Sequence, residues 1–201
     1  HVERFDDIPA SAGKAAGAAR AAALQQALGN DIPAAAISAF FTLAGSMIHD
    51  LYGLRILFGN PRRIVSTDVW NAGRALSTVL EYPNGSRCIA SWVDLPNLWD
   101  FHEALEIYGA DKRILLAYPT GFSRGQLSRL SIWKIDGSGR TVEQKPAVEW
   151  ESPFVGELRH FHACITAGQP CRTSVADALN DIKLVINSTQ AYLQGSPVDF
   201  G

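Results

Sequence analysis

Residues 75–93 read ALSTVLEYPNGSRCIASWV, and this stretch decides the fold. Two runs of strand-forming residues, 75–82 and 87–93, flank the sequence PNGS at 83–86. Asn-Gly between two such runs is a strong signal of a β-hairpin, because both residues tolerate the left-handed backbone of a tight turn. Strands joined by so short a turn are antiparallel, since parallel neighbours need a long crossover. The centre of the chain is therefore predicted to be an antiparallel sheet.

Other strand-like runs surround this hairpin. They are residues 63–71, 104–108, 113–118, 130–135 and 141–145. Short connections rich in glycine and aspartate, at 109–112 and 136–139, join the later runs in pairs. These patterns predict one sheet, mainly antiparallel, within residues 63–150.

Helical patterns precede the sheet. Residues 11–28 are rich in alanine and end at Gly29, a natural helix stop. A second stretch, 33–59, is apolar nearly all round and is predicted to be buried, with a kink or break at Gly45. The first part of the chain, 1–62, is therefore expected to be helical.

Helical patterns also follow the sheet. In residues 151–195, apolar side chains recur at spacings of three and four. The last helix is expected to begin at Thr173 or Ser174, and Asp177 would complete its capped start. Together the segments predict one α+β domain over 1–201, an open antiparallel sheet with helices packed on one face.

The other sheet face is expected to be free. Counting alternate residues places Trp70, Trp92 and Trp133 on it. A large apolar sheet face is typically covered by another subunit, so we expect a homo-oligomer formed through this face.

Composition excludes several classes of function. The formal net charge is −2, which gives no reason to expect a nucleic-acid partner. No apolar run reaches the length of a membrane span, and no secretory leader is expected. The cysteines, Cys88, Cys164 and Cys171, are scattered and indicate reduced thiols in a cytoplasmic protein. No glycine-rich phosphate loop and no zinc-ligand spacing is present, so neither a nucleotide loop nor a metal site is predicted.

Three stretches, in this order, resemble the C-terminal domain of the Gfo/Idh/MocA family of NAD(P)-dependent sugar and polyol dehydrogenases. They are GSMIHDLYGLRILFGNP at 45–61, LEIYGADKR at 105–113, and residues 157–179. The opening VERFD at 2–6 also resembles the segment that follows the family's cofactor domain. The resemblance implies the fold of a dehydrogenase C-terminal domain.

In that family an N-terminal Rossmann domain holds NAD or NADP and supplies a catalytic lysine. That domain is absent from this chain, which is expected to be a fragment of a longer protein. The resemblance implies the substrate-binding and oligomerisation half of a dehydrogenase for a sugar, polyol or related hydroxy compound. Alone, it is expected to be inactive and to bind no cofactor.

His49 is the catalytic candidate that the resemblance implies, because it matches the histidine that helps move the substrate hydroxyl proton. Imidazole titrates near neutrality and suits this task. The alternative is a structural histidine on an apolar helix. Gly45 and Tyr52 stand where the family often has aspartates, so His49 lacks its usual carboxylate partners.

Substrate contacts are expected from Asp50, Tyr52, Arg4, Trp92 and Asp94. A tryptophan beside an aspartate suits a sugar, through stacking and hydroxyl hydrogen bonds. The alternatives are an ion pair with Arg55 or a helix cap for Asp50, a surface role for Arg4, and sheet packing or a subunit contact for Trp92. The missing carboxylates favour a second function, a non-catalytic binding or assembly module that kept the fold and lost redox activity.

Overall fold

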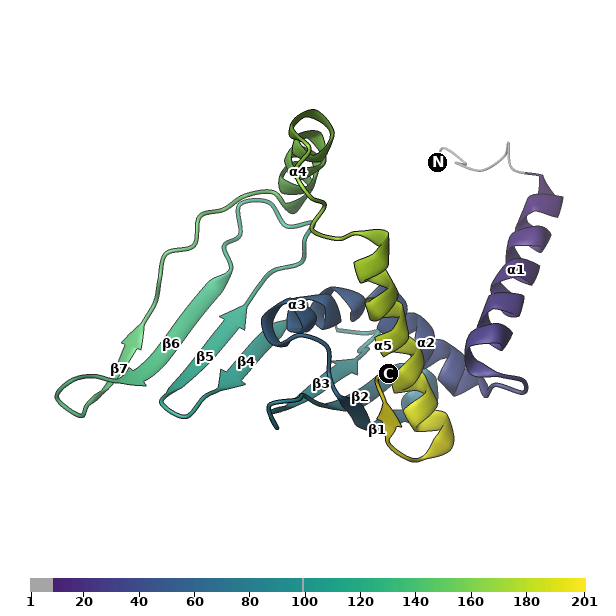
Figure 1. Ribbon diagram of the computed structural model, residues 1–201, viewed down its shortest axis with the longest axis horizontal. Coiled ribbons are helices and arrows are strands. Elements are labelled where there is room, and N and C mark those ends of the chain that lie inside the picture. The colour runs from purple at the N-terminus through teal and green to yellow at the C-terminus, as the bar shows by residue number, and fades with distance from the viewer. Residues whose placement is uncertain (1–8, 99) are drawn as a thin grey trace. The chain divides into compact units, whose positions relative to one another are not determined.

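The computed structural model describes residues 9–98 and 100–201 (Figure 1). Its helices are α1 (Ala10–Leu28), α2 (Ala34–Gly45), α3 (Ile48–Phe58), α4 (Pro153–Ala167) and α5 (Val175–Gln194), with a 3₁₀ turn η1 (Asn71–Gly73). Its strands are β1 (Arg63–Trp70), β2 (Ala75–Glu81), β3 (Arg87–Val93), β4 (Ala104–Tyr108), β5 (Lys112–Ala117), β6 (Arg129–Ile135), β7 (Thr141–Gln144) and β8 (Val198–Asp199). The expected α+β class is confirmed.

The strands form two antiparallel sheets, where a single sheet was expected. Their orders are β3-β2-β1-β8 and β4-β5-β6-β7. The predicted tight turns all lie within a sheet, and among the described residues between β3 and β4 no such turn joins the two strands. Because no local turn brings β3 beside β4, the sequence supplies nothing that makes these two strands pair.

The chain divides into two compact units. The first contains the chain up to Asp94 together with Thr173–Gly201, and the second contains Leu95–Arg172. Each unit has its own sheet. The single domain expected over 1–201 stays a prediction, because compact units need not fold separately.

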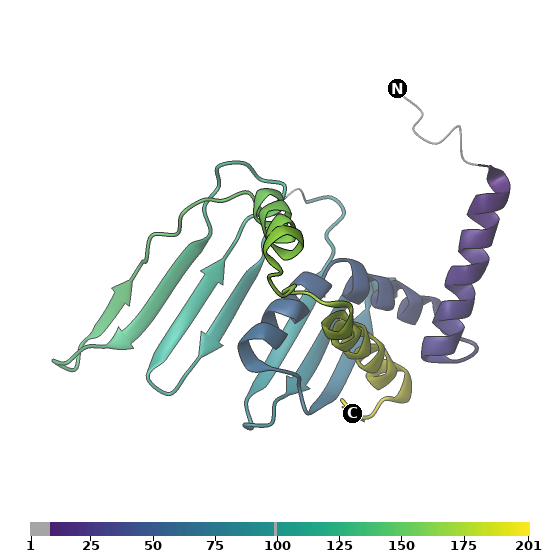
Figure 2. The ribbon, with the colours of Figure 1, turned by 45° about the horizontal axis from the view of Figure 1, so that its top comes forward.

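The core of the first unit lies between its sheet and the helices α2 and α5, which pack on β1 (Figure 2). Leu76, Thr78 and Leu80 of β2 are fully buried on this face, and Leu184 and Val185 of α5 are fully buried with them. Alternate β2 residues face the helices, as the period of two requires.

The prediction that Trp70, Trp92 and Trp133 share one sheet face is wrong, and Trp133 lies on β6 of the second sheet. Trp92 pairs with the buried Leu76, so it lies on the helix-covered face and not on the open one. Trp70 pairs with Ala75 on the opposite face and is 43% exposed. Counting by twos within one strand cannot show this, because only the pairing between strands relates their faces.

Two short elements of the first unit are absent from the sequence prediction. Strand β8 pairs with β1, and the Phe200 N–H donates to the Arg62 carbonyl at 2.9 Å. The turn η1 has positive φ at Asn71 (53°), Ala72 (57°) and Gly73 (86°). Both elements are too short to leave a periodic pattern in the sequence.

The break between α2 and α3 follows Gly45, as expected, and the two helices meet at 59°. In the part of the chain that the structure describes, no single helix is long and apolar enough to cross a membrane, although this bent pair passes that test together.

In the second unit, β4–β7 form a regular antiparallel ladder, and the Arg113 guanidinium lies 4.0 Å from the centre of the Trp133 ring. The first turn of α4 meets the loop after β5, where the rings of Phe122 and Phe154 lie 5.7 Å apart. No residue of α4 is fully buried.

Candidate functional site

Helix α3 carries three of the predicted site residues. Leu51 and Leu54 form its buried face, at 0% and 4% exposure. His49 is exposed in the first turn, about 200° around the helix from Leu51, so it points away from the core. Tyr52 lies three residues after His49 on the same face and is half-buried, as is Asp50.

The Tyr52 hydroxyl has a partner at the start of α5. The Thr173 hydroxyl donates to the Tyr52 oxygen at 3.4 Å. This contact brings residues 121 positions apart in the chain to one end of α3. The hydroxyl groups of Tyr52 and Thr173 therefore lie on the face of α3 that carries His49. The resemblance implies a carboxylate at the position of Tyr52.

Trp92 and Asp94 lie at the end of β3, on a different element of the same unit. Trp92 is half-buried against the helix-covered face. The Asp94 N–H donates to the Arg74 carbonyl at 3.0 Å, which fixes the backbone where the first unit ends. Arg4, the remaining candidate, lies outside the described residues.

Sequence reasoning missed a buried charge network that fixes α3. Arg55 forms ion pairs with Asp181 and, at 2.6 Å, with Asp177, both on α5. Its Nε also donates to the Asn60 side chain at 2.8 Å. An ion pair with Arg55 is one of the alternatives considered for Asp50, and the two ion pairs of Arg55 described here are with α5. The sequence signal for this network is a pair of aspartates four residues apart, which lie on one face of a helix, together with an arginine in an otherwise apolar helix.

The network controls the charge of Arg55. Burial acts to lower the pKa of Arg55, but hydrogen bonds and the charges of Asp181 and Asp177 outweigh it, and the pKa is raised. Arg55 is thus a permanent cation held by two aspartates. Ser174 also accepts the Asp177 N–H at 3.1 Å, which confirms the predicted capped start of α5.

A second charge cluster was also missed. The buried Glu81 of β2 accepts from Arg62, from Arg63 at 3.1 Å and from Arg87 at 2.6 Å. Hydrogen bonding from Arg62, with help from Arg63, lowers the pKa of Glu81 although burial opposes the shift. This cluster ties the β1–β2–β3 sheet together at one end.

The sequence matches no protein-family model and no curated protein. Solved structures do match, and their likeness is one of fold. A levoglucosan dehydrogenase in complex with NADH and L-sorbose superposes with a TM-score of 0.65 at 15% identity, over 79% of this chain and 50% of that one. An oxidoreductase from Bacillus cereus gives a TM-score of 0.63 at 14% identity, over 79% and 59%.

A third structure extends the set to a nucleotide-sugar enzyme. The UDP-N-acetylglucosamine 3-dehydrogenase of Acidithiobacillus ferrooxidans gives a TM-score of 0.59 at 14% identity, over 81% of this chain and 48% of that one. The chain shares the fold of part of these oxidoreductases. It spans about half the length of the solved structures that it matches.

Proposed function

We propose that the chain is the substrate-binding and oligomerisation half of an NAD(P)-dependent oxidoreductase that acts on a sugar, polyol or related hydroxy compound. The observation that carries the proposal is the shared fold with sugar and nucleotide-sugar dehydrogenases. It is supported by an exposed His49 at the first turn of α3.

The cofactor would bind to a part of the protein outside these 201 residues. The described strands pair only antiparallel, and no strand is followed by a glycine-rich turn and a helix of the dinucleotide-binding type. The described residues therefore do not fit NAD(P), and no hydride step is assigned to them. Carrying the hydride is the chemistry that a bound nicotinamide supplies.

This chain would contribute the proton chemistry and the substrate contacts. His49 exchanges a proton with the substrate hydroxyl, for which its exposure and the acid–base chemistry of imidazole are suitable. Asp50 and Tyr52 orient hydroxyl groups from the same helix. Trp92 and Asp94 stack and hydrogen-bond in the way that suits a sugar ring, and Arg4 adds a contact near the cofactor.

The open face of the first sheet supports self-association, and we include a homo-oligomer in the proposal. Trp70, Ile89 and Val93 share this face, and they are 43%, 72% and 53% exposed. An exposed apolar face of this kind is typical of an interface. The proposal also keeps the cytoplasmic location that the scattered cysteines favour.

A second candidate is a binding or assembly module without redox activity. The observation that favours it is the pair of positions flanking His49, where Gly45 has no side chain and the Tyr52 hydroxyl accepts from Thr173. A carboxylate commonly orients an imidazole, and neither of these two positions supplies one.

One experiment separates the two candidates. The intact protein is purified from its own source, and its mass is compared with the 21.8 kDa of this chain. It is then assayed for NAD(P)H formation with sugars and polyols. Oxidation of a sugar or polyol by an intact protein much heavier than 21.8 kDa supports the dehydrogenase. Binding of a sugar without turnover supports the module.

A variant then tests the role of His49. His49→Asn is expected to lower kcat about a hundredfold or more, the usual contribution of a positioned general acid–base. The matched control is His102→Asn, which alters an exposed histidine of the second unit and leaves kcat unchanged. Full activity of His49→Asn would remove the histidine from the mechanism.

A further inference from the structure

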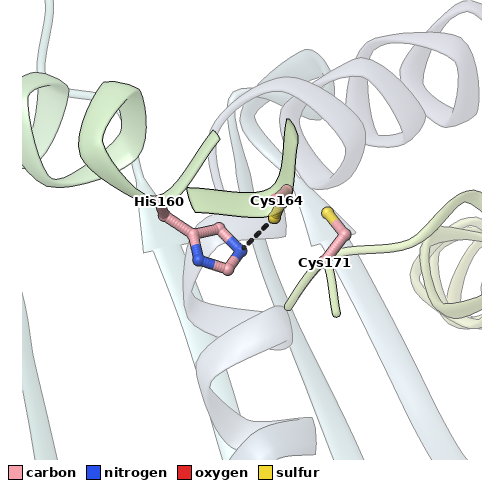
Figure 3. A group of neighbouring side chains, drawn as sticks. All are labelled: His160, Cys164 and Cys171. Atoms are coloured by element: carbon pink, nitrogen blue, oxygen red, sulfur yellow. Dashed lines mark hydrogen bonds between the residues drawn. The ribbon is translucent and has the colours of Figure 1, made fainter. Parts of the chain in front are cut away.

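The second unit contains a cluster of side chains that could bind a metal (Figure 3). His160 and Cys164 lie one turn apart on α4, and Cys171 lies in the segment that follows this helix. The Cys164 sulfur is 3.5 Å from His160 Nε2. The ligand atoms of all three residues lie within 4.8 Å of one another.

Local structure brings the third residue back to the helix. Gly168 ends α4 with φ of 65°, a left-handed conformation that reverses the chain direction. The backbone N–H of Arg172 then donates to His160 Nε2 at 3.1 Å. This bond holds Cys171, the residue just before Arg172, beside the last turns of α4.

The same hydrogen bond assigns the protonation of His160. Nε2 accepts from a backbone N–H, so it carries a lone pair, and the proton of the neutral ring lies on Nδ1. This lone pair, which accepts the Arg172 N–H when no metal is bound, is the donor that His160 would offer to a metal ion beside the two sulfur atoms. On binding, the ion would replace the Arg172 N–H at Nε2.

The distances fit a small tetrahedral cation. Zn–S bonds of about 2.3 Å and Zn–N bonds of about 2.0 Å at tetrahedral angles place sulfur and nitrogen about 3.5 Å apart. The observed separation of Cys164 Sγ and His160 Nε2 is 3.5 Å. Cys171, exposed and on a short segment after Gly168, is the ligand that would move to complete the set.

We propose that His160, Cys164 and Cys171 form a zinc site, with a water molecule as the fourth ligand. Two thiolates and one imidazole are a donor set that Zn²⁺ prefers over the hard cations Mg²⁺ and Ca²⁺. The thiols release their protons when the metal binds. Without metal, burial and the neighbouring Cys171 raise the pKa of the Cys164 thiol.

Sequence analysis missed the site because its spacing is not that of a zinc finger. The ligands follow the pattern H-x₃-C-x₆-C, in which the first pair depends on a helix and the last residue on the reversal at Gly168. Zinc would tie the end of α4 to the following segment. This matters for a helix in which no residue is fully buried.

The experiment titrates the full chain with Co²⁺ under a reducing agent that does not bind metals. One equivalent is expected to give a sulfur-to-cobalt charge-transfer band and the visible absorption of a tetrahedral site, and Zn²⁺ is expected to displace both. Cys171→Ser is expected to weaken binding about tenfold or more. Because Cys171 is exposed, this variant should keep the fold, which far-ultraviolet circular dichroism checks.

Two matched controls use residues of the same types outside the cluster. Cys88→Ser alters the thiol of β3, and His162→Asn alters a histidine on α4 that points away from His160. Both are expected to bind Co²⁺ as the unaltered chain does.

The proposal is overturned if reduced protein shows no charge-transfer band, or if the band survives in both Cys171→Ser and Cys164→Ser. Loss of two titratable thiols in air, together with no metal binding by the reduced chain, would instead identify the pair as a disulfide and would also reject the zinc site.

Discussion

Arg55 of α3 and Asp181 of α5 form an ion pair in which the side chains are only 7% and 6% exposed. Asp177 joins the same guanidinium one turn earlier on α5. Because His49 lies on α3, the orientation of the candidate catalytic residue depends on the C-terminal helix. Burial of the Arg55 charge is tolerated only while its aspartate partners are present, so the position of α3 depends on them.

Asp181→Ala is therefore expected to destabilise the chain strongly. It leaves Arg55 buried with one carboxylate instead of two, and breaking a buried pair commonly costs about 3–5 kcal/mol. A urea titration measures the free energy of unfolding. The control, Asp68→Ala at an exposed position of β1, should change it by no more than about 0.5 kcal/mol. Equal effects of the two variants would show that the ion pair does not stabilise the fold.

Acid should destabilise the protein partly through Glu81. Its pKa in the folded state lies below its ordinary value of 4.5 because Arg62 and Arg63 donate to it. A lowered pKa means that this stabilisation is complete above about pH 4.5 and is lost as the pH falls through the folded-state pKa. Urea titrations at several pH values should show a smaller loss in Glu81→Gln than in the unaltered protein.

The control for this pH dependence is Glu149→Gln, which alters an exposed carboxylate in the second unit. Its stability should fall with pH as that of the unaltered protein does. If the unfolding free energy of Glu81→Gln falls with pH as that of the control does, Glu81 does not contribute to the acid destabilisation.

Gly73→Ala is expected to destabilise the chain more than Gly85→Ala. Both glycines have positive φ, 86° and 83°, so both substitutions incur about 1–2 kcal/mol of backbone strain. Only at Gly73 would the new Cβ lie 2.5 Å from the carbonyl oxygen of Ala35, whereas nothing lies within 4 Å at Gly85. The overpacking adds about 1–3 kcal/mol, measurable by thermal or urea unfolding. Equal losses of stability at the two positions would show that α2 moves away from the new Cβ at no free-energy cost.

The chain alone is expected not to bind NAD⁺, NADH or their phosphorylated forms. The physical reason is that the described residues form no glycine-rich turn at a helix N-terminus, where a dinucleotide pyrophosphate is held. Isothermal titration calorimetry of the full chain with each cofactor measures this. Micromolar binding of any of them would refute the proposed division between substrate and cofactor parts.

Most elements could be predicted because their signals are local. The turn at 83–86 joins β2 to β3, and the cap at Ser174 begins α5, as expected. Alanine content, glycine stops and apolar periodicity each act within a few residues. Such signals survive in a single sequence.

The remaining features depend on contacts between distant segments. The face on which Trp92 lies follows from its pairing with Leu76 on another strand. The zinc-type cluster depends on how the chain turns back after α4, and the partners of Arg55 come from a helix more than a hundred residues later. No periodic pattern encodes these relationships. The resemblance could therefore identify candidate site residues, but the sequence could not predict how they are arranged in space.

The division of the first unit into two separated segments has a consequence for biosynthesis. Residues 95–172 are contiguous, so every strand and helix of the second unit is translated before α5 and β8. The first sheet is completed only after them, since α5 and β8, which cover and extend it, are translated last. Until α5 is translated, the face of β1 on which it packs stays uncovered, and exposed hydrophobic surface of this kind favours aggregation of a nascent chain.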